Sequence, residues 1–155
     1  MKPTRFLLVL LAFVCLGVTA EERTFDPELA KKLGADERGM KMYVLCILKT
    51  GPKDAEITGD ARKEIFAGHF ANIGRLAAEG KLVLAGPLDG VDGWRGLYIF
   101  AVPDIEEARK LVGTDPVIEK GEMVAEYHKY YGTAALMLVS DFHKRLTAPR
   151  PAPQK

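Results

Sequence analysis

The chain has 155 residues, of which 22 are Lys or Arg and 21 are Asp or Glu. This length predicts one compact domain, and a hydrophobic fraction of 48% with 28% charged residues excludes a wholly disordered chain. A net charge of +1 provides no basic surface for phosphate backbones, so we predict no nucleic-acid partner. The two cysteines are too few for a disulfide framework or a cysteine-rich zinc site.

The first twenty residues have the pattern of an export signal. Lys2 and Arg5 precede the apolar run FLLVLLAFVCLGV, and side chains of small or modest size follow up to Ala20. The run is too short for a permanent membrane-spanning helix. We therefore predict a signal peptide over residues 1–20, a periplasmic or secreted protein, and no stable membrane span after cleavage. A retained membrane anchor is the alternative.

Cleavage after Ala20 would change both the charge and the thiol count. It would leave 20 basic against 21 acidic residues, so the net charge would become −1. Cys15 would be removed, and we predict no lipidation there because Val14 stands where a lipoprotein signal has a small residue. Cys46 would remain as the one thiol, and its apolar surroundings in the sequence predict that it is buried.

The mature chain begins with a charged leader and then a β-rich segment. Residues 21–39 have no sustained apolar stripe, so we predict a leader that is partly ordered at most, with a short helix over 27–33. The folded domain is expected to begin at Met40. Residues 40–49 are apolar at both alternating sets of positions, which predicts a central strand covered on each side and ended by Thr50-Gly51-Pro52.

Residues 59–80 have the apolar spacing of a helix, with Gly80 at its C-terminal end. Gly68 and Gly74 weaken this helix, which indicates close packing or a bend at these positions. The expected inward side consists of Ile65, His69, Ile73 and Leu76, with Phe66, Phe70 and Ala77 beside them.

Two strands are predicted over residues 81–88 and 94–102, joined by the Gly- and Asp-rich hairpin 89–93. Pro87 cannot donate a hydrogen bond to a neighbouring strand, so we expect the first of these strands at an edge of the sheet. The second strand is apolar on both faces, which predicts a central position.

The last elements of the predicted core are a helix, a further helical turn and an edge strand. Pro103-Asp104 begins a helix that runs to Val112. Residues 117–121 form one more turn, and residues 122–131 alternate between apolar and polar side chains as an edge strand does.

This order of elements predicts an α+β, ferredoxin-like βαββαβ fold with an antiparallel sheet and two helices on one face. A second copy of the chain is the simplest cover for the other face, so we predict a homodimer. Residues 133–146 predict an extra C-terminal helix that packs on its own domain or on a partner. The tail 147–155 contains three prolines and is expected to be flexible.

These segments resemble the YCII-related (YciI-like) domain family over residues 40–132. The resemblance is carried, in order, by YVLCIL, AGHFANIGRLAAEGKL, LAGPL, GLYIFAV, DIEEARKLV and TDPVIEKGEM. It implies a small ferredoxin-like domain that pairs into a dimeric α/β barrel. It also implies a candidate enzyme site with a His and an Asp, at positions that match His69 and Asp115. The export signal and the C-terminal helix depart from the family's plain pattern.

His69 and Asp115 are the candidate catalytic residues. His69 is the one polar residue on the inward side of the predicted helix, and Asp115 lies just before the last strand. An imidazole beside a carboxylate can accept a proton near neutral pH, which favours isomerisation or elimination on a small cyclic or aromatic substrate. The alternative is structural: Asp115 would cap the following turn, and His69 would be a core histidine bonded to a backbone carbonyl.

Other side chains give weaker indications. Tyr43, Trp94, Arg95 and Tyr98 are candidates for a pocket wall, although sheet packing is the alternative for all four. His128 and His143 are not at metal-ligand spacing with His69, so we predict no metal and no cofactor.

Two functions from different classes therefore remain open. The first is an exported lyase or isomerase that acts on a small organic ligand through His69 and Asp115. The second is a non-catalytic ligand-binding or assembly module that uses the C-terminal helix and the open sheet face.

Overall fold

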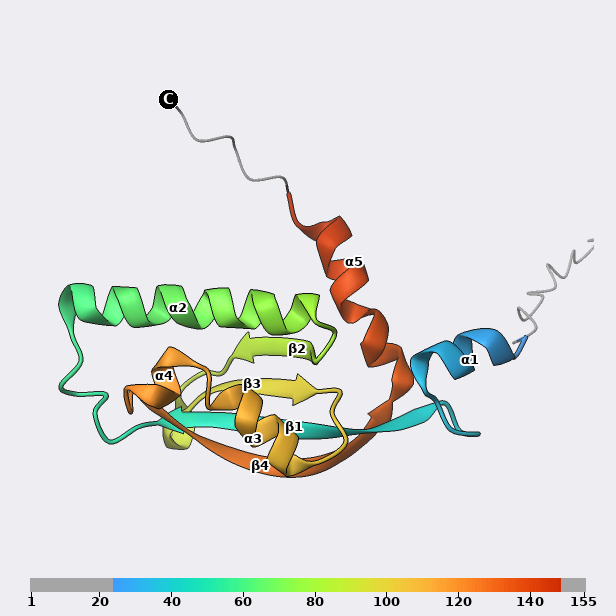
Figure 1. Ribbon diagram of the computed structural model, residues 1–155, viewed down its shortest axis with the longest axis horizontal. Coiled ribbons are helices and arrows are strands. Elements are labelled where there is room, and N and C mark those ends of the chain that lie inside the picture. Colours follow the sequence, from blue (N-terminus) through green and yellow to red (C-terminus); the bar gives the residue numbers. More distant parts are fainter. Residues whose placement is uncertain (1–23, 149–155) are drawn as a thin grey trace, which may run out of the picture.

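The computed structural model describes residues 24–148 and has a four-stranded antiparallel sheet at its centre (Figure 1). The strand order is β2-β3-β1-β4. The strands are β1 (Met40–Thr50), β2 (Leu82–Pro87), β3 (Trp94–Phe100) and β4 (Met123–Thr133). The predicted ferredoxin-like fold is confirmed, with β1 and β3 central and β2 and β4 at the edges. The predicted signal peptide and most of the predicted tail lie outside the described residues.

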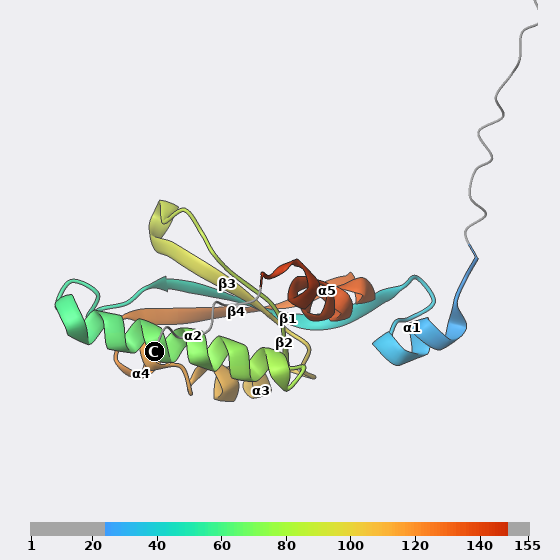
Figure 2. The ribbon, with the colours of Figure 1, turned by 90° about the horizontal axis from the view of Figure 1, so that it is seen from above.

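Three helices lie against one face of the sheet, as Figure 2 shows from above. They are α2 (Gly59–Ala78), α3 (Ile105–Val112) and the single turn α4 (Pro116–Glu119). Asp104 and Asp115 cap α3 and α4, because each side chain accepts a hydrogen bond from a backbone N–H of the first turn. In the described part of the chain no helix is both long enough and apolar enough to cross a membrane.

The main core lies between this helix layer and the sheet. β1 contributes the buried side chains of Val44, Cys46 and Leu48, which alternate along the strand as its apolar pattern predicts. Leu76 of α2 and Phe100 of the neighbouring strand β3 belong to the same cluster. Phe70 lies beside the inward stripe of α2, with its ring centroid 5.4 Å from that of His69, and it is 65% exposed.

Part of the other sheet face is covered by the chain's own C-terminal segment. The expected single helix over 133–146 is instead a 3₁₀ helix, η2 (Ala134–Leu138), followed by α5 (Val139–Leu146). Because η2 follows β4 directly, Leu136 and Met137 reach the sheet and pack against the small cluster of Tyr43, Val83 and Ile99. A second copy is therefore not needed to cover this part of the face.

The remaining elements are short. The predicted leader helix is present as α1 (Pro27–Leu33), and Gly34 ends it in a left-handed conformation. The hairpin between β2 and β3 contains one 3₁₀ turn, η1 (Val91–Gly93).

The two glycines of α2 differ in their surroundings. A Cβ on Gly68 would lie 2.8 Å from Cγ of Pro116, whereas a Cβ on Gly74 would have no heavy atom of the described residues within 4 Å. Close packing against Pro116 thus explains why position 68 is a glycine, but no such contact explains Gly74. The absent side chain at position 68 lets α4 approach α2, and this approach brings Asp115 toward His69.

We expect Gly68→Ala and Gly74→Ala to change stability in opposite directions. Gly74→Ala should raise the free energy of unfolding by about 0.5–1 kcal/mol through helix propensity alone. Gly68→Ala gains the same propensity but should lower the free energy of unfolding by about 1–3 kcal/mol because of the clash with Pro116. Urea denaturation of both variants measures the difference, and equal shifts would contradict the assigned contact.

Candidate functional site

Three elements bring together the polar side chains at the centre of the helix-covered face. His69 lies on α2, Tyr98 on β3 and Asp115 at the start of α4. Nδ1 of His69 is 3.0 Å and 2.9 Å from the two carboxylate oxygens of Asp115. The two residues that the sequence singled out as a pair are therefore in direct contact.

The Asp115 carboxylate is fully buried and has three groups around it that can donate hydrogen bonds. The Tyr98 hydroxyl donates to Oδ2 at 2.9 Å, the backbone N–H of Val117 donates to Oδ1 at 3.2 Å, and His69 Nδ1 faces both oxygens. Such donors offset the cost of removing a carboxylate from water. The Asp115 carboxylate thus has both roles that the sequence suggested for it: it caps the turn α4, and it contacts His69.

Tyr98 remains a hydrogen-bond donor over the physiological pH range. Burial and the adjacent negative charge of Asp115 raise the pKa of Tyr98 well above its ordinary value. The same two causes, burial first, raise the pKa of the Cys46 thiol to about 12. Cys46 is fully buried, as its apolar surroundings predicted, and its thiol stays protonated beside the site.

The other nitrogen of the His69 ring, Nε2, faces a different environment. It has no hydrogen-bond partner among residues 24–148, and His69 lines a hollow of about 340 Å³. With Nδ1–H directed at Asp115, neutral His69 carries its lone pair on Nε2. The other lining residues are mostly apolar: Leu48, Phe66, Phe70, Ile73, Ala85, Gly86, Pro87, Arg95, Gly96, Tyr98 and Met123.

Arg95 contributes a positive charge to the wall of this hollow. Its Nη1 donates to Oδ1 of Asp54 at 2.7 Å, and this hydrogen bond lowers the pKa of Asp54. Nη2 of Arg95 is 3.8 Å from the fully buried Glu122. Arg62 contacts the same two carboxylates, at 2.7 Å and 2.9 Å. The carboxylates of Asp54 and Glu122, which Arg62 also contacts, hold the Arg95 guanidinium in place at the edge of the hollow.

The remaining candidates have other locations. Tyr43 does not line this hollow, contrary to the expectation, because it packs in the cluster on the opposite sheet face and its hydroxyl donates to the Thr133 carbonyl. Trp94 also lies outside the wall and is 42% exposed. Among residues 24–148, no three His, Cys, Asp or Glu side chains are grouped closely enough to hold a metal ion.

Sequence reasoning missed how two residues support the site. Tyr98 was expected only as a wall residue, and its hydrogen bond to Asp115 depends on the pairing of β3 with β1. Asn72 is buried one turn after His69, and Arg75 donates both to Asn72 Oδ1 at 2.7 Å and to Thr114 Oγ1 at 3.0 Å. These bonds tie α2 to the loop that carries Asp115.

A comparison with protein families gives a match over more than half of the chain. The family model of the YCII-related domain matches residues 42–128. The chain belongs to the YCII-related domain family. The matched residues of this YCII-domain protein include His69, Tyr98 and Asp115, whereas α1 and α5 lie outside them.

Among solved structures, this YCII-domain protein is similar to 5-chloro-2-hydroxyhydroquinone dehydrochlorinase from Burkholderia phenoliruptrix, in complex with 2,5-dihydroxybenzoquinone. The two share 21% sequence identity with a TM-score of 0.43, over 57% of this chain and 92% of the other. A search of the curated proteins found no match.

Proposed function

We propose that this YCII-domain protein is an exported enzyme that transfers a proton on a small cyclic or aromatic substrate, in an isomerisation or an elimination. One observation supports this proposal above the others. The buried His69 ring contacts Asp115 through Nδ1 and lines the hollow, and its Nε2 has no hydrogen-bond partner among residues 24–148. This is the arrangement that a general base requires.

In the proposed reaction, Nε2 of His69 takes a proton from a carbon of the substrate, and the electron pair of the broken C–H bond stays on the substrate. The resulting imidazolium is stabilised by the Asp115 carboxylate. In an isomerisation the proton returns to another carbon. In an elimination a leaving group departs with its bonding pair. Arg95 would face the negative charge that develops on the substrate.

The second candidate is a non-catalytic ligand-binding module. It is favoured by one observation: Asp115 also accepts the backbone N–H of Val117 and so has a structural role as the cap of α4. In this function the hollow would bind a ligand without any proton transfer. Binding alone therefore does not separate the two functions, but exchange of a carbon-bound proton does.

Deuterium exchange tests the proposed chemistry. Unsaturated cyclic ketones, lactones and phenols are incubated with the protein in D₂O, and NMR follows the loss of carbon-bound protons. We expect at least one compound to exchange faster with folded protein than with heat-denatured protein, because Nε2 abstracts the proton reversibly. If a compound shifts the His69 signals but never exchanges, the result supports the non-catalytic module and contradicts the enzyme.

We further propose that a second copy covers the rest of the open sheet face. Val124 and Tyr130 of β4 are exposed there, next to Glu126 and His128. These two exposed apolar side chains lie on one face, on either side of the Glu126–His128 contact, and exposed apolar surface favours association. Light scattering should give the mass of two chains, and Val124→Asp should shift it toward one. A single-chain mass for the wild type would contradict this proposal.

A further inference from the structure

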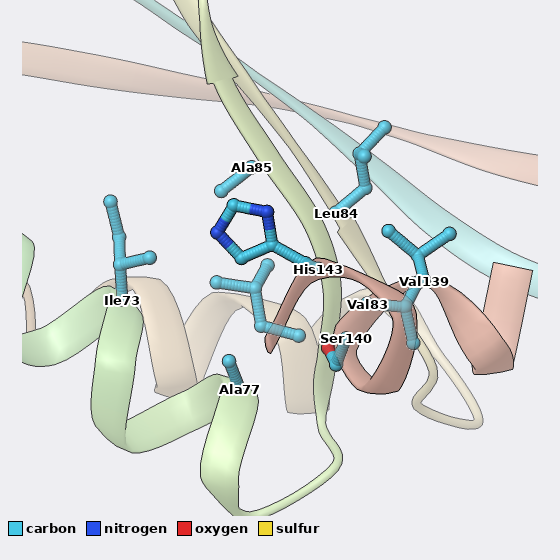
Figure 3. A pocket seen from close by; sticks show the side chains of 9 residues that line it. Ile73, Ala77, Val83, Leu84, Ala85, Val139, Ser140 and His143 are labelled. Carbon is cyan, nitrogen blue, oxygen red and sulfur yellow. The ribbon is translucent and has the colours of Figure 1, made fainter. Parts of the chain in front are cut away.

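A second hollow borders the one that contains His69. It measures about 180 Å³ and lies between α2, the edge strand β2 and α5 (Figure 3). Ile73 and Ala85 line both hollows. The two spaces are therefore neighbours along α2, and a bound molecule could extend from one into the other past these two side chains.

The chemistry of the second hollow differs from that of the first. Its walls on α2 and β2 are aliphatic, while α5 contributes Ser140 and His143. In Figure 3 the His143 ring points from α5 toward Ile73 and Ala85. A hydroxyl and an imidazole can each donate or accept a hydrogen bond. The far end of the combined space thus suits a polar group on an otherwise apolar molecule.

The spacing along α2 sets the length of that molecule. His69, Ile73 and Ala77 follow one another at four-residue intervals, and the last two line the second hollow. The eight-residue separation of His69 and Ala77 corresponds to a rise of about 12 Å along the helix, which suits two directly linked six-membered rings with a polar group at each end.

We propose that the ligand of the His69 site is an elongated two-ring molecule with a hydrogen-bonding group at each end. One end lies at His69, the apolar middle passes Ile73 and Ala85, and the distal polar group binds Ser140 and His143. This inference rests on the proposed function of the His69 hollow. It makes α5, which lies outside the residues matched by the family, the element that selects ligand length.

The three histidines of the chain allow a direct test by proton NMR. His69 reports on the first hollow and His143 on the second, while His128 on β4, which lines neither hollow, serves as an internal control. Single His→Gln variants assign the three sets of ring signals. Phenol and para,para′-biphenol, a two-ring diol, are the probes.

We expect phenol to shift the His69 signals alone and the two-ring diol to shift those of both His69 and His143, with His128 unchanged. The Ser140→Ala, His143→Ala double variant should bind the diol at least about fivefold more weakly than the wild type does, which is the value of one or more hydrogen bonds. It should bind phenol as the wild type does.

Two results would overturn the inference, and they differ. If the diol shifts His69 but not His143, or binds the double variant unchanged, the ligand does not extend to α5 and the proposed function still stands. If neither probe shifts His69, phenolic rings do not enter the hollow and this inference fails. Exchange on the cyclic ketones and lactones then decides the proposed function separately.

Discussion

Replacing His69 with asparagine is expected to slow proton exchange on the active ring compound by about 10²–10⁴-fold, the usual contribution of a positioned general base. Asparagine is the informative substitution because its side-chain N–H₂ can take the place of Nδ1 and still donate to Asp115. It has no group in the place of Nε2. The variant should therefore lose the proton acceptor while keeping the buried hydrogen bond.

The loss should appear in kcat and leave KM within a few-fold, because apolar residues form most of the wall and are unchanged. His128→Asn is the matched control: His128 contacts Glu126 on the opposite face of the sheet and does not line the hollow, so its replacement should leave turnover at the wild-type rate. If His69→Asn turns over the compound within about threefold of the wild-type rate, His69 is not the general base.

Much of the fold could be predicted because the relevant signals are local. Residues Met40–Lys49 are apolar on both faces of the strand, and this pattern predicted its central position. Pro87 predicted that its own strand lies at an edge. Both predictions follow from the backbone's need for hydrogen-bond partners on each side of a buried strand. The C-terminal segment was harder to predict, because its apolar spacing does not separate a 3₁₀ turn from an α-helix.

The candidate site could be predicted only in part, because its geometry depends on contacts between distant segments. The inward side of α2 placed His69, but residue spacing cannot show that Tyr98 reaches Asp115 or that Tyr43 faces the other way. Gly68 illustrates the same limit. Its sequence signal equals that of Gly74, and only the approach of Pro116 distinguishes the two glycines.

Replacing Asp115 with alanine should be the most destabilising single change at the site. It leaves the Tyr98 hydroxyl, the His69 Nδ1–H and the Val117 N–H buried without their acceptor. We expect the free energy of unfolding to fall by about 3–5 kcal/mol, as for other broken buried pairs. That is a large part of the stability of a small domain, so Asp115→Asn, which keeps one acceptor oxygen, is the milder companion.

Asp104→Ala is the matched control for this loss. Asp104 also caps a helix, α3, where it accepts the N–H of Glu107, three residues on, at 2.8 Å, whereas Asp115 accepts the N–H two residues on. Asp104 lies in an exposed position and binds no other side chain among the described residues. Its replacement should cost only about 1 kcal/mol. Urea denaturation followed by the fluorescence of Trp94, the one tryptophan, measures all three variants. The excess loss at Asp115 over Asp104 is then the contribution of the buried contacts with His69 and Tyr98, and an equal loss at both positions would show that Asp115 acts as a helix cap alone.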